Sequence, residues 1–178
     1  ALPICIEAVR SSTPKACREN IKKCLSIIMN GSQDELHNFI EKFREEFLTL
    51  PFEDVAFPRG VKGMYKYTDK ASIYKKGTPI HVKGALLFNH VLDKNKITKI
   101  PKISDGDKIR FAYLKIPNPL QDTVIAVPDE LPKELEFIDK YIDREKQFEK
   151  SFLEPLNSIT DVIDWSTEQK STLEDFFG

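Results

Sequence analysis

The chain has 178 residues, of which 40% are hydrophobic and 31% are charged, so a sizeable core is expected and global disorder is excluded. Its longest apolar runs, ALLF and SIIM, are too short to cross a membrane. The net charge of −1 hides an asymmetry, because residues 55–118 contain 14 Lys or Arg and only 4 Asp, whereas the remainder contains 13 basic and 24 acidic residues.

The first 50 residues predict a short strand followed by two helices. Apolar residues alternate over 2–8, and Pro14 suits the first position of a helix. Asn30-Gly31 would end that helix with a residue that tolerates positive φ, and Ser32 precedes Glu35 at the spacing of a capping box. We expect an antiparallel hairpin whose core-facing stripes are Cys17, Ile21, Cys24, Leu25, Ile28, Leu36, Phe39, Ile40, Phe43 and Phe47.

In the basic middle of the chain, the helical spacing of apolar residues gives way to a pattern typical of strands. Residues 80–91 (IHVKGALLFNHV), 108–116 (KIRFAYLKI) and 122–128 (DTVIAVP) are rich in β-forming residues, and Asp105-Gly106 is a turn signal. We expect a small sheet with long basic loops.

A helical pattern returns after Pro132, and Pro155 should kink or restart the helix. Residues from 166 onward turn polar and are expected to form a linker. The predicted fold class is therefore α+β, with a helical hairpin, a small basic β-rich section and closing helices. The closing residues expected to pack inward are Phe137, Ile138, Tyr141, Ile142, Phe148, Phe152, Leu153, Ile159, Val162, Ile163 and Trp165.

Motifs of several enzyme classes are absent. The sequence has no P-loop, no GxSxG and no GxGxxG, and its three histidines form no metal-ligand pattern. Its three cysteines form no CxxC pair, and Cys17 and Cys24 are expected to be reduced thiols on an apolar helix face. Asp105 and Asp107 are the only close carboxylate pair in the basic section, so a metal-dependent nuclease stays open as an alternative.

The charge of the middle section favours a polyanion partner over a merely solvated lysine-rich surface. In AFPRGV (56–61) and YKKGTPIHVKGALLFN (74–89), glycines stand beside basic residues, which lets a backbone approach a phosphate. This pattern suits a protein that holds a duplex regardless of sequence, although His81 taken alone is better interpreted as an ordinary sheet residue.

Five motifs in order, VRSSTPKA, FPRGV, YKKGTPIHVKGALLFN, YLKIPNP and FEKSFLEPL, resemble the carboxyl-terminal part of family B DNA polymerases of the T-even-like bacteriophage type. The resemblance covers nearly the whole chain, and the chain is expected to be a piece of a longer protein. It implies that residues 1–12 end the palm, that 13–166 form the DNA-holding thumb, and that 167–178 form a linker with a sliding-clamp-binding peptide.

The same resemblance implies which partners and cofactors to expect. The partners would be the primer–template duplex, a sliding clamp and the rest of the polymerase (palm, fingers and exonuclease), in the cytoplasm of an infected bacterial host. The family's palm aspartates hold two Mg²⁺ ions in SLYPS-like and DTDS-like motifs, and neither motif occurs here. We therefore expect no cofactor and no catalytic residue in this chain, and no polymerisation or proofreading by it alone. The residues that the resemblance assigns to DNA are Arg59, Gly60, Lys62, Lys66, Lys76, Gly77, His81, Lys83 and Gly84.

Near the last residue, Leu173, Phe176 and Phe177 stand at helical spacing i, i+3 and i+4. One helical turn would place them on one side, where they resemble the clamp-binding peptide of replicative polymerases. The position of the usual glutamine is Lys170 here, with Gln169 adjacent. The alternative is that this tail folds onto the protein's own core.

A different class of function, a stand-alone single-stranded nucleic-acid-binding protein, would need exposed aromatic rings along a basic groove. The rings at Phe47, Phe137, Phe148 and Phe152 lie on apolar stripes and are expected to be buried, which argues against this class.

Overall fold

The computed structural model describes residues 10–169 and divides the chain into two compact units. Unit 1 comprises residues 10–50 and 148–169, and unit 2 comprises residues 51–147. The described residues form six α-helices and one three-stranded antiparallel sheet, which confirms the α+β class. This division crosses the predicted 13–166 thumb, whose assignment stays a prediction.

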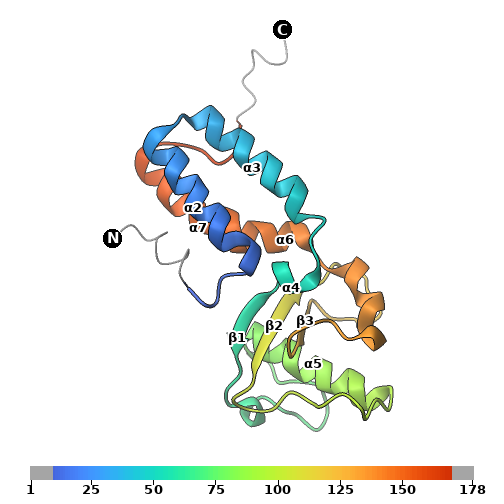
Figure 1. Ribbon diagram of the computed structural model, residues 1–178. Coiled ribbons are helices and arrows are strands. Elements are labelled where there is room, and N and C mark those ends of the chain that lie inside the picture. Colours follow the sequence, from blue (N-terminus) through green and yellow to red (C-terminus); the bar gives the residue numbers. More distant parts are fainter. Residues whose placement is uncertain (1–9, 170–178) are drawn as a thin grey trace. The chain divides into compact units, whose positions relative to one another are not determined.

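The first part of unit 1 is the predicted helical hairpin, with α2 (Lys15–Asn30) followed by α3 (Gln33–Phe47), seen side by side in Figure 1. The Ser32 hydroxyl caps α3 by accepting a 3.2 Å hydrogen bond from the Glu35 N–H, as the capping-box spacing predicted. Gly31 does not take positive φ, because its φ is −117°. A Cβ at this position would lie 2.5 Å from Glu35 Oε2, at the end of a flexible side chain, and 3.0 Å from the Ile27 carbonyl oxygen, so a larger residue would displace the Glu35 side chain.

Four phenylalanines form the centre of the unit 1 core. Phe43 and Phe47 from α3 meet Phe148 and Phe152, with ring centroids 4.8–5.8 Å apart. Edge-on and tilted packing of this kind stabilises the core beyond the burial of apolar area alone.

The closing segment consists of α6 (Arg144–Phe148), a π-helical turn (Glu149–Leu153), α7 (Glu154–Thr160) and a 3₁₀ turn (Asp161–Ile163).

The proline in this segment restarts the helix as predicted, because Pro155 lies in the first turn of α7. The expectation that Val162 and Ile163 pack inward is wrong: Val162 is 81% exposed, and Ile163 is exposed as well.

Cys17 and Cys24 are buried as expected. Burial raises the pKa of each thiol to about 12, so neither is a reactive thiolate at neutral pH.

Unit 2 is built on a sheet whose strands lie in the order β1 (Phe57–Gly60), β2 (Lys108–Tyr113), β3 (Val124–Val127). In its register, Phe57 pairs with Phe111 and Phe111 pairs with Ala126. Helix α5 lies against this sheet (Figure 1). The strands predicted in 108–116 and 122–128 are confirmed. The elements are α4 (Phe52–Val55), β1 (Phe57–Gly60), a 3₁₀ turn (Met64–Lys66), α5 (Ile80–Lys94), β2 (Lys108–Tyr113), β3 (Val124–Val127) and a 3₁₀ helix η2 (Lys133–Tyr141).

The prediction of a strand over 80–91 is wrong, because this stretch is the first part of α5. A short apolar run such as ALLF satisfies either period, and its packing partner decides between them. Here the helix buries Gly84, Leu87 and Val91 at the helical spacing i, i+3 and i+7.

Phe137 is also predicted wrongly, because its side chain is 46% exposed. The three-residue period of η2 directs Leu135 and Ile138 inward and leaves Phe137 outside that stripe. None of the helices within residues 10–169 is long and apolar enough to cross a membrane.

Substituting Gly84 with alanine should lower the free energy of unfolding by about 1–3 kcal/mol, because the added Cβ overpacks the contact of α5 with β3. That Cβ would lie 2.8 Å from the Ala126 backbone nitrogen and 3.0 Å from the Ile125 carbonyl carbon. Alanine is the better helix former by about 1 kcal/mol, so a net loss isolates the packing effect. The measurement is urea unfolding. Gly60→Ala, whose Cβ meets nothing within 4 Å, serves as the control and should change little. A more stable Gly84→Ala variant would contradict the close approach.

Candidate nucleic-acid interface

The largest local excess of positive charge lies in residues 59–83, here called the basic segment. It contains seven Lys or Arg and a single acidic residue, Asp69. It runs from the end of β1 through the 3₁₀ turn and a long loop into the first turn of α5. This segment contains every residue that the sequence assigned to DNA except Gly84, which follows it directly.

The turn that follows β1 is fastened to a second loop. The Asp105 carboxylate accepts hydrogen bonds from the backbone N–H groups of Gly63 (3.0 Å) and Met64 (2.8 Å). Two backbone bonds, from the Val61 N–H to the Asp107 carbonyl (2.9 Å) and from the Gly106 N–H to the Val61 carbonyl (2.8 Å), complete the contact. The start of the basic segment therefore has a defined position.

This arrangement explains the DGD sequence without a metal. Both Asp105 oxygens accept backbone N–H groups, and the Asp107 carboxylate accepts the Ser104 N–H at 2.8 Å. Gly106 takes the left-handed conformation (φ 91°) that the turn requires. Within residues 10–169, no group of three or more His, Cys, Asp or Glu side chains is placed to hold a metal ion. These contacts weigh against the nuclease alternative.

The later part of the loop is held by its own turn contacts. The Lys75 N–H donates to the Tyr67 carbonyl (2.9 Å), and the Thr78 hydroxyl donates to the Lys75 carbonyl (2.7 Å). Asp69 closes a small turn by accepting from the Ala71 N–H and the Ser72 hydroxyl, and these hydrogen bonds lower the pKa of its carboxyl. The one acid of the segment thus accepts hydrogen bonds from its own turn and forms no ion pair with a lysine of the segment.

The lysines and the arginine of the basic segment are not neutralised. In the part of the chain that the structure describes, none of the seven lies within ion-pair distance of a carboxylate. Later basic residues of unit 2 differ, because Lys99 pairs with Glu134, Lys102 with Asp93 and Arg110 with Asp129. The basic segment therefore combines the highest density of basic residues with the absence of an ion pair at any of its seven cations in the described part of the chain.

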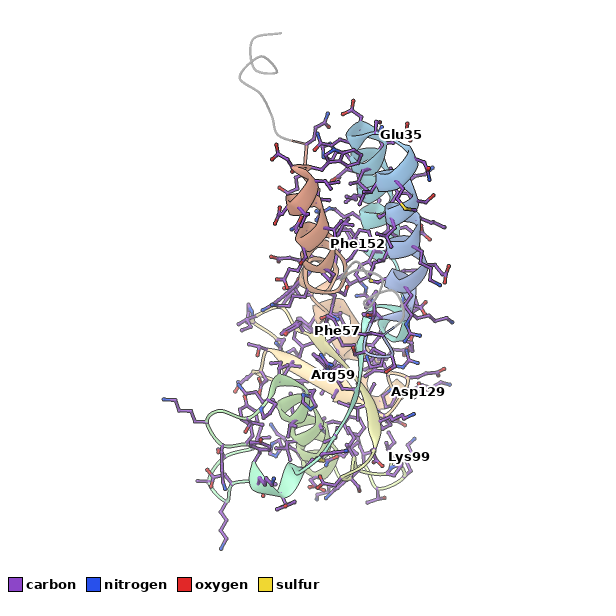
Figure 2. The ribbon with its side chains drawn as sticks, turned by 90° about the vertical axis from the view of Figure 1, so that its left-hand side faces the viewer. Glu35, Phe57, Arg59, Lys99, Asp129 and Phe152 are labelled. Atoms are coloured by element: carbon purple, nitrogen blue, oxygen red, sulfur yellow. The ribbon has the colours of Figure 1, made fainter. Side chains whose placement is uncertain are left out.

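Arg59 lies close enough to His81 for its charge to act on the imidazole, although the two residues are 22 positions apart in the chain. Arg59 follows Phe57 on β1, as Figure 2 shows, and the Phe57 ring stacks on Phe111 at 5.2 Å. The His81 ring, in the first turn of α5, lies 6.3 Å from Phe111. Burial, and then the charge of Arg59, lower the pKa of His81, which keeps its imidazole neutral at pH 7.

The other predicted residues divide into three groups. Lys62, Lys66 and Lys76 are exposed, whereas Lys83 is partly buried. Gly60 and Gly77 face open space, and Gly77 has a φ of 84°. A DNA contact for these residues stays a prediction.

Gly84 does not fit the role assigned to it. It is buried, and its missing side chain is accounted for by the close approach of α5 to Ala126 rather than by a phosphate. Tyr74 and Asp122, whose side chains are hydrogen-bonded at 2.8 Å, were not among the predicted residues. Tyr74 lies within the motif YKKGTPIHVKGALLFN, but no local signal connects it with Asp122.

A hollow of about 920 Å³ lies in unit 1 between the start of α3 and residues 157–169. Its charged lining consists of Asp34, Asp161, Asp164 and Glu168, with His37 also present. Four carboxylates would repel a phosphate backbone, so this hollow is not part of the candidate interface. The predicted clamp-binding residues Leu173, Phe176 and Phe177 lie outside the described residues.

No family model matches the chain. Over 176 residues, 97% of its length, it is 29% identical to a DNA-directed DNA polymerase of Enterobacteria phage T4. Over 177 residues it is 27% identical to a DNA-directed DNA polymerase of Escherichia phage RB69. The chain spans about one fifth of the length of each of these relatives, 19% in both cases.

The protein is therefore related, along nearly its whole length, to a part of phage DNA polymerases. These polymerases are of the T-even type, which confirms the resemblance that the five sequence motifs indicated.

Replacing His81 with glutamine should reduce the pH dependence of stability below neutral pH. Because the folded pKa of His81 is lowered from 6.5, the unfolded chain takes up the proton first, and stability is lost as pH falls below 6.5 toward the folded pKa. Urea unfolding between pH 7 and 5 should show a shallower decline for His81→Gln than for the wild type. His90→Gln, an exposed histidine of the same helix, is the control and should keep the wild-type decline. Identical slopes for His81→Gln and the wild type would contradict the burial of this imidazole against Arg59.

Proposed function

We propose that this chain is the duplex-holding thumb part of a replicative DNA-directed DNA polymerase, a nucleotidyltransferase. The observation that carries the proposal is the basic segment, whose seven cations lie on an anchored loop without carboxylate partners. The relation to the T4 and RB69 polymerases supports the same function.

The chemistry of this surface is that of backbone recognition. Lysine ammonium groups act as point charges toward phosphates, and the planar guanidinium of Arg59 can donate two parallel hydrogen bonds to one phosphate. Neither contact reads a base, so a duplex would be held in the same way at every sequence. That property suits a protein that must follow a growing primer–template.

The chemical step itself belongs to other parts of the polymerase. The 178 residues contain neither the SLYPS-like nor the DTDS-like motif, so Mg²⁺ and the reacting groups would be held by the palm. This chain alone would neither add nucleotides nor remove them. Its partners would be the primer–template duplex and the rest of the polymerase, in the cytoplasm of an infected bacterial cell.

The alternative, a stand-alone single-strand binder, is not favoured. Such proteins stack bases on exposed rings. Phe47, Phe148 and Phe152 are fully buried in the unit 1 core, and Phe137 is the one ring of that expected set that is exposed.

A second part of the proposal concerns the tail. The i, i+3, i+4 spacing of Leu173, Phe176 and Phe177 supports a short helical turn that inserts into an apolar pocket of a sliding clamp. Burial of each side chain could contribute about 1.5–3 kcal/mol before the cost of ordering the peptide. A tether of roughly micromolar affinity would hold the polymerase on DNA and still exchange.

Duplex binding should be independent of sequence and strongly dependent on salt. With about four to six phosphate contacts, the slope of log affinity against log salt should be about −4 to −5. Arg59→Ala and Lys83→Ala should each weaken binding to unrelated duplexes equally and reduce the slope by about 1. Lys102→Ala is the matched control, since its ammonium is already paired with Asp93. The measurement is a titration of labelled duplex at several salt concentrations, and a flat salt dependence would contradict the proposal.

Loss of the two terminal rings should weaken clamp binding without affecting the fold. A peptide of residues 169–178 should bind the sliding clamp of a T-even-type phage, and the Phe176→Ala, Phe177→Ala double variant should bind at least tenfold more weakly, as expected from the burial of two rings. Calorimetric titration measures both affinities. The control is the melting temperature of the chain with residues 169–178 deleted, which should match the intact chain. A drop of several degrees would show that the tail packs on the protein's own core.

A further inference from the structure

Tyr74, Asp122 and Lys83 form a chain of contacts at the end of the basic segment. The Tyr74 hydroxyl donates a 2.8 Å hydrogen bond to Asp122 Oδ2. The Lys83 ammonium lies over the Tyr74 ring, 5.2 Å from its centroid. These residues come from the long loop, from the turn before β3 and from the first turn of α5, so the contacts join three parts of unit 2.

The Asp122 end of this chain is rigidly held. Asp122 Oδ1 accepts the Thr123 N–H at 2.7 Å, and the Asn118 side-chain amide donates to the Asp122 carbonyl at 2.7 Å. The same amide donates to the Lys115 carbonyl at 2.8 Å, while its oxygen accepts the Leu120 N–H at 2.9 Å. Asp122 is therefore a fixed acceptor against which Tyr74 is oriented.

We propose that Tyr74 is a positioning residue for DNA binding. Asp122 fixes the orientation of Tyr74, and the Tyr74 ring holds the Lys83 ammonium in place for a phosphate without neutralising its charge. This inference rests on the proposed function, because it assumes that Lys83 contacts duplex.

The aromatic ring does what a direct ion pair would not do. Asp93 contacts the Lys102 ammonium at 2.7 Å and thereby compensates its charge. Asp122 instead bonds to the phenol, and within the described residues Lys83 is in no ion pair. The ring face attracts the cation through its quadrupole, and a hydrogen bond from the phenol to a carboxylate makes the ring richer in electrons. Lys83 keeps its full charge for a phosphate.

Two further properties suit this role. Burial and the Asp122 hydrogen bond raise the pKa of Tyr74 to about 12, so the phenol stays protonated and remains a donor at every physiological pH. A lysine that is already confined loses less side-chain freedom on binding, which favours affinity.

The test is duplex titration with the full chain and five variants: Tyr74→Phe, Asp122→Ala, Asp122→Asn, Lys83→Ala and the Tyr74→Phe, Lys83→Ala double. Asp122→Ala distinguishes positioning through Tyr74 from a purely electrostatic effect of the carboxylate. Removing an acid beside a cationic surface should tighten DNA binding by electrostatics alone, whereas loss of the hydrogen bond that orients Tyr74 should weaken it. We expect Asp122→Ala and Tyr74→Phe each to bind about three- to tenfold more weakly than the wild type. Asp122→Asn, which keeps an acceptor oxygen, should bind at least as tightly as the wild type.

The mechanism is checked by coupling and by salt. Tyr74→Phe should leave the salt slope unchanged, and the double variant should bind no more weakly than Lys83→Ala alone. Tyr141→Phe is the matched control, since Lys140 lies over its ring at the same 5.2 Å but outside the basic segment. Melting temperatures identify any variant that is not folded, in which case the partner substitution at the other end of the hydrogen bond decides. Wild-type affinity in Tyr74→Phe, tighter binding in Asp122→Ala, or additive losses in the double would overturn the inference. Absence of binding by the wild type would overturn the proposed function and this inference with it.

Discussion

The close approach of α5 to β3 at Gly84 and Ala126 determines where the basic segment lies within unit 2. A helix normally stands off a sheet by the length of its side chains, but here no side chain separates the helix from the Ala126 backbone. This approach brings the first turn of α5, with His81 and Lys83, close to the sheet and the loop before the helix. The positions of Phe111 and Arg59 relative to His81 depend on the same contact.

Three acids that hold the basic segment in place, Asp69, Asp105 and Asp122, have a common use that is evident when their partners are compared. Asp105 binds two backbone N–H groups, Asp69 binds its own turn, and Asp122 binds a phenol and a backbone N–H. All three carboxylates anchor the loop through neutral donors. The lysines beside them therefore keep their charge, which is the condition for a surface that binds a polyanion.

Unit 1 lacks this character. Its core is made of close-packed phenylalanine rings and buried thiols, and the hollow at the start of α3 is lined by carboxylates. Under the proposed function, the expected DNA contacts therefore lie in unit 2, and unit 1 would serve as a scaffold. The contrast follows the charge segregation of the sequence, in which 24 of the 28 acidic residues fall outside 55–118.

The sequence by itself determined the features that depend on neighbours in the chain. The helical hairpin, the Ser32 cap, the strand at 108–113, the restart at Pro155 and the excess of positive charge all follow from local spacing and composition. The tertiary structure alone decided whether residues 80–91 form a helix or a strand, because an apolar run is compatible with both until its packing surface is known. It also decided which lysines find acids and which do not. Tyr74 and Asp122 are 48 positions apart, and only the folding of the loop onto the turn before β3 brings them together. No local pattern in the sequence predicts a hydrogen bond between residues so far apart in the chain.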